Sequence, residues 1–330
     1  MKPTLILVLV LFFCSLISSQ TIVKDISYVS STETDAYRKE RCKLDIAYFG
    51  DLKNRPVAIY FHGGGLTSDV KSLPGYYRKL NYIEVAPDYR LSPNAKCPAY
   101  LEDAAEAIAW VWNNIERYGG DKSRIIVTGY SAGAYLATMM AMDTTYLKKY
   151  DISSDSIWIY FSESAQMTTH FTIMAERGIN SGSAGEYIDK YAPLYYKRSV
   201  KSYVVLATGD RELDMAGRYD QNTKMYNMLE SLGVKVTYWE FPGETHATVG
   251  SVARAKFVDE LKRGMFFKAV VDKTDSVYVN DVDFEEGVGT LYTVMGSKIK
   301  DNPVLSDLKK GVCYIYRTRL NKFEKIVKGE

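Results

Sequence analysis

Short apolar segments of strand length alternate with segments of helical spacing over most of this chain, and this alternation restricts the fold more than any other feature. Continuous apolar runs predict strands buried on both faces, whereas apolar residues three and four positions apart predict amphipathic helices. Strands are expected at 44–48, 57–61, 82–86, 125–128, 157–161, 203–207 and 234–241, and helices at 101–112, 132–142, 218–232 and 252–267. The order predicts an α/β fold with a mostly parallel central sheet and helices on both faces, in which a ligand binds beyond the carboxyl ends of the strands.

Two later segments fall outside this alternation. Residues 162–200 carry Gly and Tyr without strand periodicity, and we expect them to form a cap insert over the carboxyl edge of the sheet. Residues 268–330 change to short alternating runs, which predict a small C-terminal β-rich appendage on the main domain, 21–267. The runs lie at 276–279, 290–294 and 313–319. The sequence does not reveal what the appendage does.

The first twenty residues have the layout of a signal peptide. Lys2 precedes an apolar run at 5–17, and the small residues Ser18 and Ser19 follow. The run is shorter than the roughly 20 residues that span a bilayer, and no later segment is apolar for long enough. We therefore expect a secreted or exported protein with no membrane span once residues 1–20 are removed.

Charge and cysteine content exclude some classes of partner and cofactor. The 42 Lys and Arg nearly balance the 40 Asp and Glu, so nothing global attracts the chain to nucleic acid. Cys42, Cys97 and Cys313 remain after signal removal, and a Cys42–Cys97 disulfide is one pairing that an oxidising compartment allows; three unpaired thiols are the alternative. No Cys and His cluster has metal-ligand spacing, so no metal site is expected.

A possible nucleophile lies in Gly129-Tyr130-Ser131-Ala132-Gly133, between a predicted strand and a predicted helix. Small residues permit the tight turn that projects a serine hydroxyl above a sheet. The pentapeptide alone would arise by chance in about one chain in ten. Its position between strand and helix, and the motifs below, are what favour Ser131 as a nucleophile.

A glycine motif, His62-Gly63-Gly64-Gly65, directly follows the strand expected at 57–61 and is far rarer by chance. Glycines there let backbone N–H groups approach a tetrahedral intermediate. We predict that an oxyanion hole is formed by the N–H groups of Gly64, Gly65 and Ala132.

A serine hydroxyl needs a neighbouring base, and the chain holds three histidines. His62 belongs to the glycine motif, and His170 lies in the cap insert before any plausible acid strand. His246 follows the last predicted strand, which completes the order serine, acid, histidine. We therefore predict His246 as the base.

The acid of a triad should follow the strand at 203–207, where three candidates occur. Glu212 ranks first because the loop should return toward His246 there. Asp214 ranks second because it could equally cap the next helix, and Asp210 ranks third because it is close to the strand end.

Aromatic residues near the predicted loops are candidates for lining a substrate pocket. They are Tyr76, Tyr77, Tyr130, His170 and Phe171, and ordinary packing is the alternative for each. Asp88, Arg90 and Asp103 are expected to form a structural polar set beneath the serine turn.

Together these motifs resemble those of the hormone-sensitive-lipase-like and feruloyl-esterase-like carboxylesterases of the α/β-hydrolase superfamily. The similar elements are 62–65, 88–93, 118–121, 129–133 and His246, within about 44–267. The resemblance implies the α/β-hydrolase fold, a serine, acid and histidine triad, no cofactor, and hydrolysis of carboxylic esters. Two departures are the spread of acids over 210–214 and the region after Lys268.

We therefore expect a secreted serine hydrolase that cleaves small-molecule, short-chain carboxylic esters through an acyl-enzyme on Ser131, because no long apolar lid helix is visible. One alternative is an amidase, such as an arylformamidase, that uses the same residues. Another is a catalytically silent binding or adhesion protein on the same fold. The sequence leaves the oligomeric state and the exact ester open.

Overall fold

The structure, a computed structural model, describes residues 20–50, 52–179, 186–214 and 217–266, and four strands nearer the C-terminus. The chain divides into two compact units, Met1–Lys256 and Phe257–Glu330. The first contains the sheet and the serine turn, and the second is described separately below.

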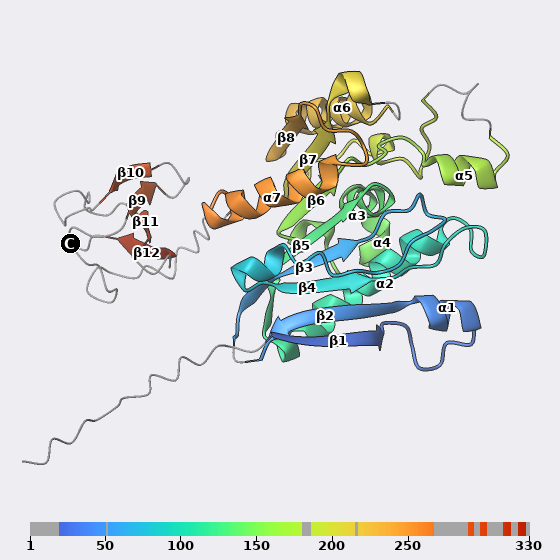
Figure 1. The fold of residues 1–330 in the computed structure, drawn as a ribbon, viewed down its shortest axis with the longest axis horizontal. Coiled ribbons are helices and arrows are strands. Elements are labelled where there is room, and N and C mark those ends of the chain that lie inside the picture. The colour runs from blue at the N-terminus through green and yellow to red at the C-terminus, as the bar shows by residue number, and fades with distance from the viewer. Residues whose placement is uncertain are drawn as a thin grey trace, which may run out of the picture. The chain divides into compact units, whose positions relative to one another are not determined.

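The first unit is built on an eight-stranded sheet with strand order β1-β2-β4-β3-β5-β6-β7-β8 (Figure 1). The strands from β4 through β8 in this order pair in parallel, while β2 pairs antiparallel with both β1 and β4. The bounds are β1 Gln20–Ser27, β2 Lys43–Phe49, β3 Arg55–Phe61, β4 Ile83–Pro87, β5 Gly120–Tyr130, β6 Ile159–Glu163, β7 Tyr203–Gly209 and β8 Val236–Phe241. The prediction of a mostly parallel α/β sheet is confirmed.

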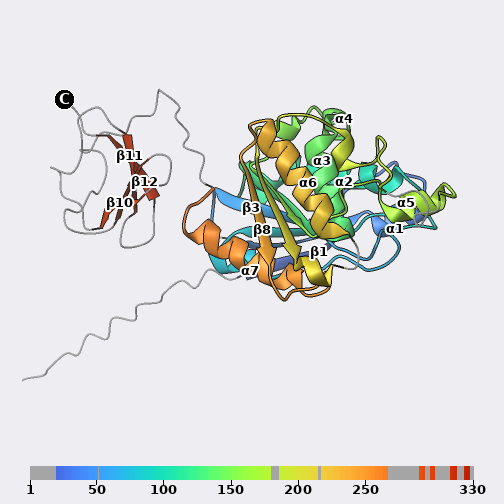
Figure 2. The ribbon, with the colours of Figure 1, turned by 90° about the horizontal axis from the view of Figure 1, so that it is seen from above.

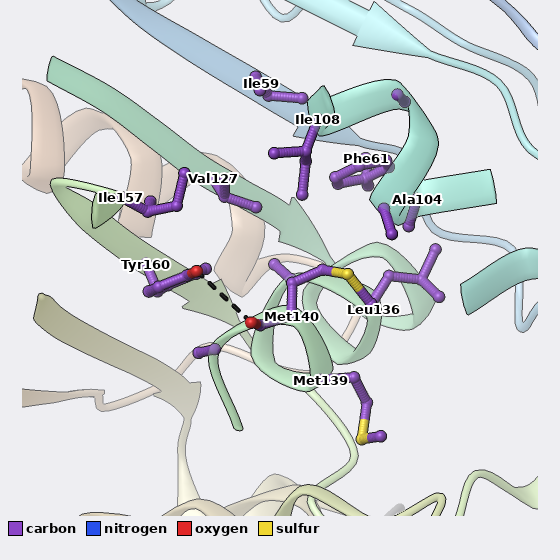
Figure 3. Packing of buried hydrophobic residues seen from close by; sticks show 14 of the residues in the cluster. Ile59, Phe61, Ala104, Ile108, Val127, Leu136, Met139, Met140, Ile157 and Tyr160 are labelled. Carbon is purple, nitrogen blue, oxygen red and sulfur yellow. Dashed lines mark hydrogen bonds between the residues drawn. The ribbon is translucent and has the colours of Figure 1, made fainter. Parts of the chain in front are cut away.

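Helices cover both faces of this sheet. Their bounds are α1 Ala36–Arg41, α2 Ala99–Asn114, α3 Ala132–Met142, α4 Thr144–Lys148, α5 Phe171–Glu176, α6 Arg218–Ser231 and α7 Val249–Lys262. Figure 3 shows Met140 and Leu136 of α3 packed between the strands and α2, with Phe61 facing them. Because neighbouring strand residues point to opposite faces, Tyr60 points away from α3, and there it meets Arg254 of α7. Figure 2 shows α3 and the start of α7 on opposite sides of the sheet.

The first strand was not predicted from the sequence. β1 begins at Gln20, the last residue assigned to the signal peptide, and pairs with β2 at the edge of the sheet. Nearly all its residues are exposed, so it lacks the apolar alternation that reveals a strand. Residues 1–19, which hold the rest of the predicted signal peptide, lie outside the described residues.

The predicted cap insert begins later than expected, because β6 continues to Glu163. Within it, α5 starts after His170, whose Nδ1 accepts a hydrogen bond from the Thr172 amide. The Thr172 hydroxyl donates to the Gly65 carbonyl at 2.5 Å, which ties α5 to the glycine motif. The insert therefore contacts the loop after β3.

The second unit contains four short strands in one antiparallel sheet of order β10-β9-β11-β12. Their bounds are β9 Thr290–Thr293, β10 Lys298–Asp301, β11 Cys313–Arg317 and β12 Phe323–Val327. The runs predicted at 290–294 and 313–319 contain β9 and β11, whereas the run at 276–279 lies outside the described residues. The β10 and β12 strands were not predicted.

The suggested Cys42–Cys97 disulfide is wrong. Both thiols are free, and they lie in different surroundings. Cys42 is buried beside Tyr28, while Cys97 lies beside Tyr100 at the start of α2. The side chain of Cys313 lies outside the described residues. In the part of the chain that the structure describes, no helix is long and apolar enough to cross a membrane.

Candidate active site

The turn at Ser131 has the strained geometry of a nucleophile elbow. Ser131 connects β5 to α3 with φ 55° and ψ −114°, values that L residues rarely adopt. A Cβ on Gly133 would lie 2.0 Å from the Phe61 carbonyl oxygen, and one on Gly129 would lie 2.5 Å from the Gly133 backbone. Only glycine fits at both positions, so the turn can rest directly against the end of β3.

His246 reaches Ser131 from the loop between β8 and α7. Its Nε2 lies 3.0 Å from the Ser131 Oγ. Two contacts hold the imidazole there: its ring stacks on Tyr130 at 5.4 Å between centroids, and the Tyr130 hydroxyl donates to the His246 carbonyl. Partial burial, and then the charge of Arg218, lower the pKa of His246 below its usual 6.5. A neutral imidazole, able to accept the serine proton, is therefore favoured at neutral pH.

The other imidazole nitrogen contacts a serine that the sequence did not single out. The Ser164 Oγ lies 2.8 Å from the His246 Nδ1. Ser164 immediately follows β6, the strand beside β5, and is 1% exposed. For Nε2 to accept a proton from Ser131, the ring hydrogen must lie on Nδ1, and Nδ1 then donates a hydrogen bond to the Ser164 hydroxyl. Its position at the carboxyl end of the neighbouring strand is the one sequence signal that could have suggested Ser164.

The first-ranked acid, Glu212, does not contact His246. It lies in the 3₁₀ turn Arg211–Leu213, and the residue is exposed. Asp210 holds this turn, because its carboxylate accepts from the Glu212 amide and from the Gly243 amide, both at 2.8 Å. These bonds lower the pKa of Asp210 and use its side chain to join the loops after β7 and β8. This turn therefore leaves Glu212 exposed to solvent, and both carboxylate oxygens of Asp210 are already used in backbone hydrogen bonds.

Asp214, the second choice, is the acid whose charge acts on His246. Its negative charge raises the pKa of His246 and so partly opposes the effects of burial and of Arg218. One carboxylate oxygen accepts from the Tyr219 amide in the first turn of α6. The expectation that Asp214 caps the following helix and the expectation that it acts on the histidine are thus compatible.

The glycine motif forms a turn with free donors beside the elbow. Gly64 and Gly65 have φ of 87° and 64°, and the Gly64 carbonyl accepts from the Thr67 and Ser68 amides at 3.0 Å. Among the described residues, no acceptor is recorded for the N–H groups of Gly64 and Gly65. Ala132 is the first residue of α3, where N–H groups have no acceptor within the helix. The three predicted donors are therefore free to bind an oxyanion.

A buried ion pair lies behind the elbow. Glu163, 0% exposed, accepts a hydrogen bond from the Arg254 guanidinium, which also packs over the rings of Tyr60 and Tyr76. The Glu163 carbonyl in turn accepts from the Ser131 amide at 2.9 Å. Burial raises the pKa of Glu163 to about 8 even though Arg254 lowers it. The pair joins β6, which precedes Ser164, to α7, which follows His246.

The aromatic candidates fall into different surroundings. Tyr77 is 0% exposed, so the prediction that it lines a substrate pocket is wrong; it packs in the core. Tyr76 covers Arg254 instead. His170 is buried, and burial followed by the charge of Arg218 holds its pKa well below 6.5. Phe171 is exposed, and its ring lies beside Gly65, so it borders the oxyanion loop.

The predicted polar set separates into two groups. Arg90 forms a two-pronged pair with Asp103, with N–O distances of 2.8 and 2.7 Å. Asp88 instead lies 3.1 Å from the His62 Nε2 and 3.1 Å from an Arg41 nitrogen. These contacts support the loops below the site.

Residues 44–176 match the BD-FAE family. Esterase LipQ of Mycobacterium tuberculosis is 40% identical over 107 residues, which are 30% of this chain and 25% of that protein. Probable carboxylesterase 1 of Arabidopsis thaliana is 33% identical over 105 residues, 27% of this chain and 33% of that protein. The matched part thus covers a third or less of these relatives.

Solved structures resemble more of the chain. A truncated carbohydrate esterase from gut microbiota has a TM-score of 0.59 at 17% identity and covers 72% of this chain and 94% of its own. Two structures of the esterase of the archaeon Pyrobaculum calidifontis have TM-scores of 0.56 and 0.57 at 19% identity, and the match covers 76% of this chain and 87% of theirs. The chain therefore has the α/β-hydrolase fold, and its residues 44–176 are similar to the BD-FAE family and to parts of several esterases and carboxylesterases.

Proposed function

We propose that this protein is a serine hydrolase of carboxylic esters, with Ser131 as nucleophile and His246 as base. The observation that carries the proposal is the 3.0 Å contact between Ser131 Oγ and His246 Nε2 at a strained turn. Strain at such a turn is retained where function requires it. The free amides of Gly64 and Gly65 beside the turn support the same chemistry.

The reaction follows from these positions. The Ser131 oxygen attacks the ester carbonyl carbon and its proton moves to His246 Nε2, while the carbonyl oxygen becomes an anion held by the N–H groups of Gly64, Gly65 and Ala132. The C–O bond then breaks, and the alcohol leaves with the proton from Nε2. Water attacks the acyl-enzyme, passes one proton to Nε2, and Ser131 recovers that proton as the carboxylic acid departs.

Two groups act on His246 during these steps. The Ser164 hydroxyl accepts a hydrogen bond from Nδ1–H and so favours the tautomer in which Nε2 is a base. The negative charge of Asp214 stabilises the imidazolium that forms after proton transfer. In this proposal a neutral hydrogen bond and a more distant charge divide the work that one carboxylate performs in a usual triad.

Short acyl groups and export remain part of the proposal. Phe171, the exposed aromatic residue beside Gly65, would border an acyl group held at the oxyanion loop. The apolar run at 5–17 supports export, and N-terminal sequencing of the mature protein would test it by locating the cleavage near residue 20.

Replacement of Ser131 tests the function. We expect Ser131→Ala to lower kcat/KM for 4-nitrophenyl acetate by at least about 10⁴-fold and to abolish labelling by a fluorophosphonate, since Ser131 carries the hydroxyl that His246 Nε2 contacts. Ser162→Ala, a buried serine on the adjacent strand, is the matched control and should keep both. Undiminished hydrolysis by Ser131→Ala would refute the proposal. Faster turnover of an N-formyl aromatic amine than of acetyl esters would favour an amidase instead.

A further inference from the structure

Arg218 is a buried cation without a partner in the part of the chain that the structure describes. It is the first residue of α6 and is 6% exposed. No hydrogen bond or ion pair of its side chain occurs among the described residues, and its Nε is buried without any acceptor. Burial of an unpaired charge is costly, and buried arginines are normally paired. The partly buried arginines Arg254 and Arg90 each pair with a carboxylate, Glu163 and Asp103 respectively.

The first turn of α6 is held against the segment that follows β6. The Asn222 side-chain amide donates to the Ala165 carbonyl at 2.8 Å, and the Gln221 side-chain oxygen accepts from the Met167 amide at 2.9 Å. Ala165 directly follows Ser164, which contacts His246. These bonds place Arg218 next to the segment that holds the catalytic histidine.

The charge of Arg218 reaches the site from this position. It lowers the pKa of both His246 and His170, two imidazoles that come from different loops. Burial lowers the pKa of Arg218 itself to about 10, because the charges of Asp214 and Tyr130 only partly compensate. The charge of the guanidinium therefore acts on both imidazoles, while no carboxylate among the described residues forms an ion pair with it.

We propose that Arg218 binds a carboxylate of the substrate, so that the protein prefers esters that carry a free carboxylate. This inference rests on the proposed function and names its substrate class. A guanidinium offers donors in a planar fork that fits a carboxylate, and a bound anion would supply the partner that Arg218 does not find among the described residues. The carboxylate belongs either to the acyl group or to the alcohol, and the two are distinguished by experiment.

Two matched ester pairs test the preference. The mono-4-nitrophenyl ester of glutaric acid, against its methyl-capped diester, places the charge on the acyl side. The compound 4-acetoxybenzoate, against its methyl ester, places it on the alcohol side. After subtraction of spontaneous hydrolysis, we expect wild-type kcat/KM to be about 10- to 100-fold higher for the anionic member of one pair, and Arg218→Met to remove that preference.

Stability separates binding from a structural role. Because the unpaired charge is unfavourable in the free protein, Arg218→Met should melt at or above the wild-type temperature. Arg211→Met, an exposed arginine in the preceding loop, is the matched control and should change neither selectivity nor melting. Three results for Arg218→Met would overturn the assignment. They are an equal loss of kcat/KM on charged and neutral esters, a clearly lower melting temperature, and an unchanged preference for the charged ester.

Glutarate alone tests the site without turnover. We expect it to raise the melting temperature of the wild-type protein and of Ser131→Ala, but not of Arg218→Met. If no ester is hydrolysed and no fluorophosphonate reacts, the proposed function fails. A glutarate-induced rise in melting temperature that depends on Arg218 would still support the anion site. No rise in melting temperature would overturn the anion site. If neutral esters alone are hydrolysed and glutarate does not bind, the function stands and this inference fails.

Discussion

Replacing Ser164 by alanine removes one oxygen atom from the Nδ1 side of His246. The Oγ that is lost lies 2.8 Å from Nδ1, and the residue is 1% exposed. Ser164 has φ 56°, but serine and alanine both carry a Cβ, so the backbone strain is the same in the two proteins. The variant therefore reports on the hydrogen bond.

The size of the effect follows from the type of bond. A neutral hydrogen bond contributes about 0.5–1.5 kcal/mol, which corresponds to about a 2- to 13-fold lower kcat/KM. Loss of a triad carboxylate that contacts the histidine costs about 10⁴-fold. We expect Ser164→Ala in the first range, and we expect Asp214→Asn to add to it because the imidazolium then loses its stabilising charge.

The assay is hydrolysis of 4-nitrophenyl acetate, with the active enzyme counted by fluorophosphonate titration. Ser162→Ala is the control, because the Ser162 hydroxyl accepts from Thr138 at 3.1 Å rather than contacting His246. An unchanged Ser164→Ala, or an equal loss in Ser162→Ala, would refute the reasoning. A loss of 10³-fold or more in Glu212→Gln would show that Glu212 orients the histidine in the working enzyme and that the Ser164 contact is incidental.

Two further predictions concern charge. Arg254→Met should lower the free energy of unfolding by about 3–5 kcal/mol at pH 9, because Glu163 must then either stay charged without its partner or take up a proton at high pH. The loss should be smaller at pH 6, below the folded pKa of about 8, because Glu163 is then protonated and has no charge to compensate. Equal losses in urea unfolding at both pH values would contradict this. The acid limb of kcat/KM should lie below pH 6.5, because only neutral His246 is a base and its pKa is lowered. Asp214→Asn should move that limb lower still, and a midpoint above 6.5 would count against the assignment of the base.

Much of the fold was accessible from the sequence. The buried strands β3 and β7 are continuous apolar runs, and α2 and α3 have clear helical spacing, so these elements were predicted within a few residues. Only the apolar part of β5 was predicted, at 125–128, because its first residues are polar and partly exposed. The exposed edge strand β1 was missed because an edge strand with both faces in solvent needs no apolar pattern.

The candidate site divides in the same way. The glycines around Ser131 could be recognised in the sequence because a side chain at either position would clash with nearby backbone. His246 could be chosen from its place in the chain order. The surroundings of the three acids could not be read from spacing, because the cap formed by Asp210, a contact between two loops, leaves Glu212 exposed in this structure.

Sequence by itself determined the elements that depend on neighbours along the chain: the strands, the elbow glycines, the oxyanion turn and the order of serine before histidine. The tertiary structure alone decided which side chains meet from separate strands, because such contacts depend on register and packing rather than on spacing. Of this second kind are the contact of Ser164 with the histidine, the pair of Glu163 with Arg254, and the burial of Arg218 with no partner in the described part of the chain. None of these residues stands out in the sequence, and their contacts are seen only in the tertiary structure.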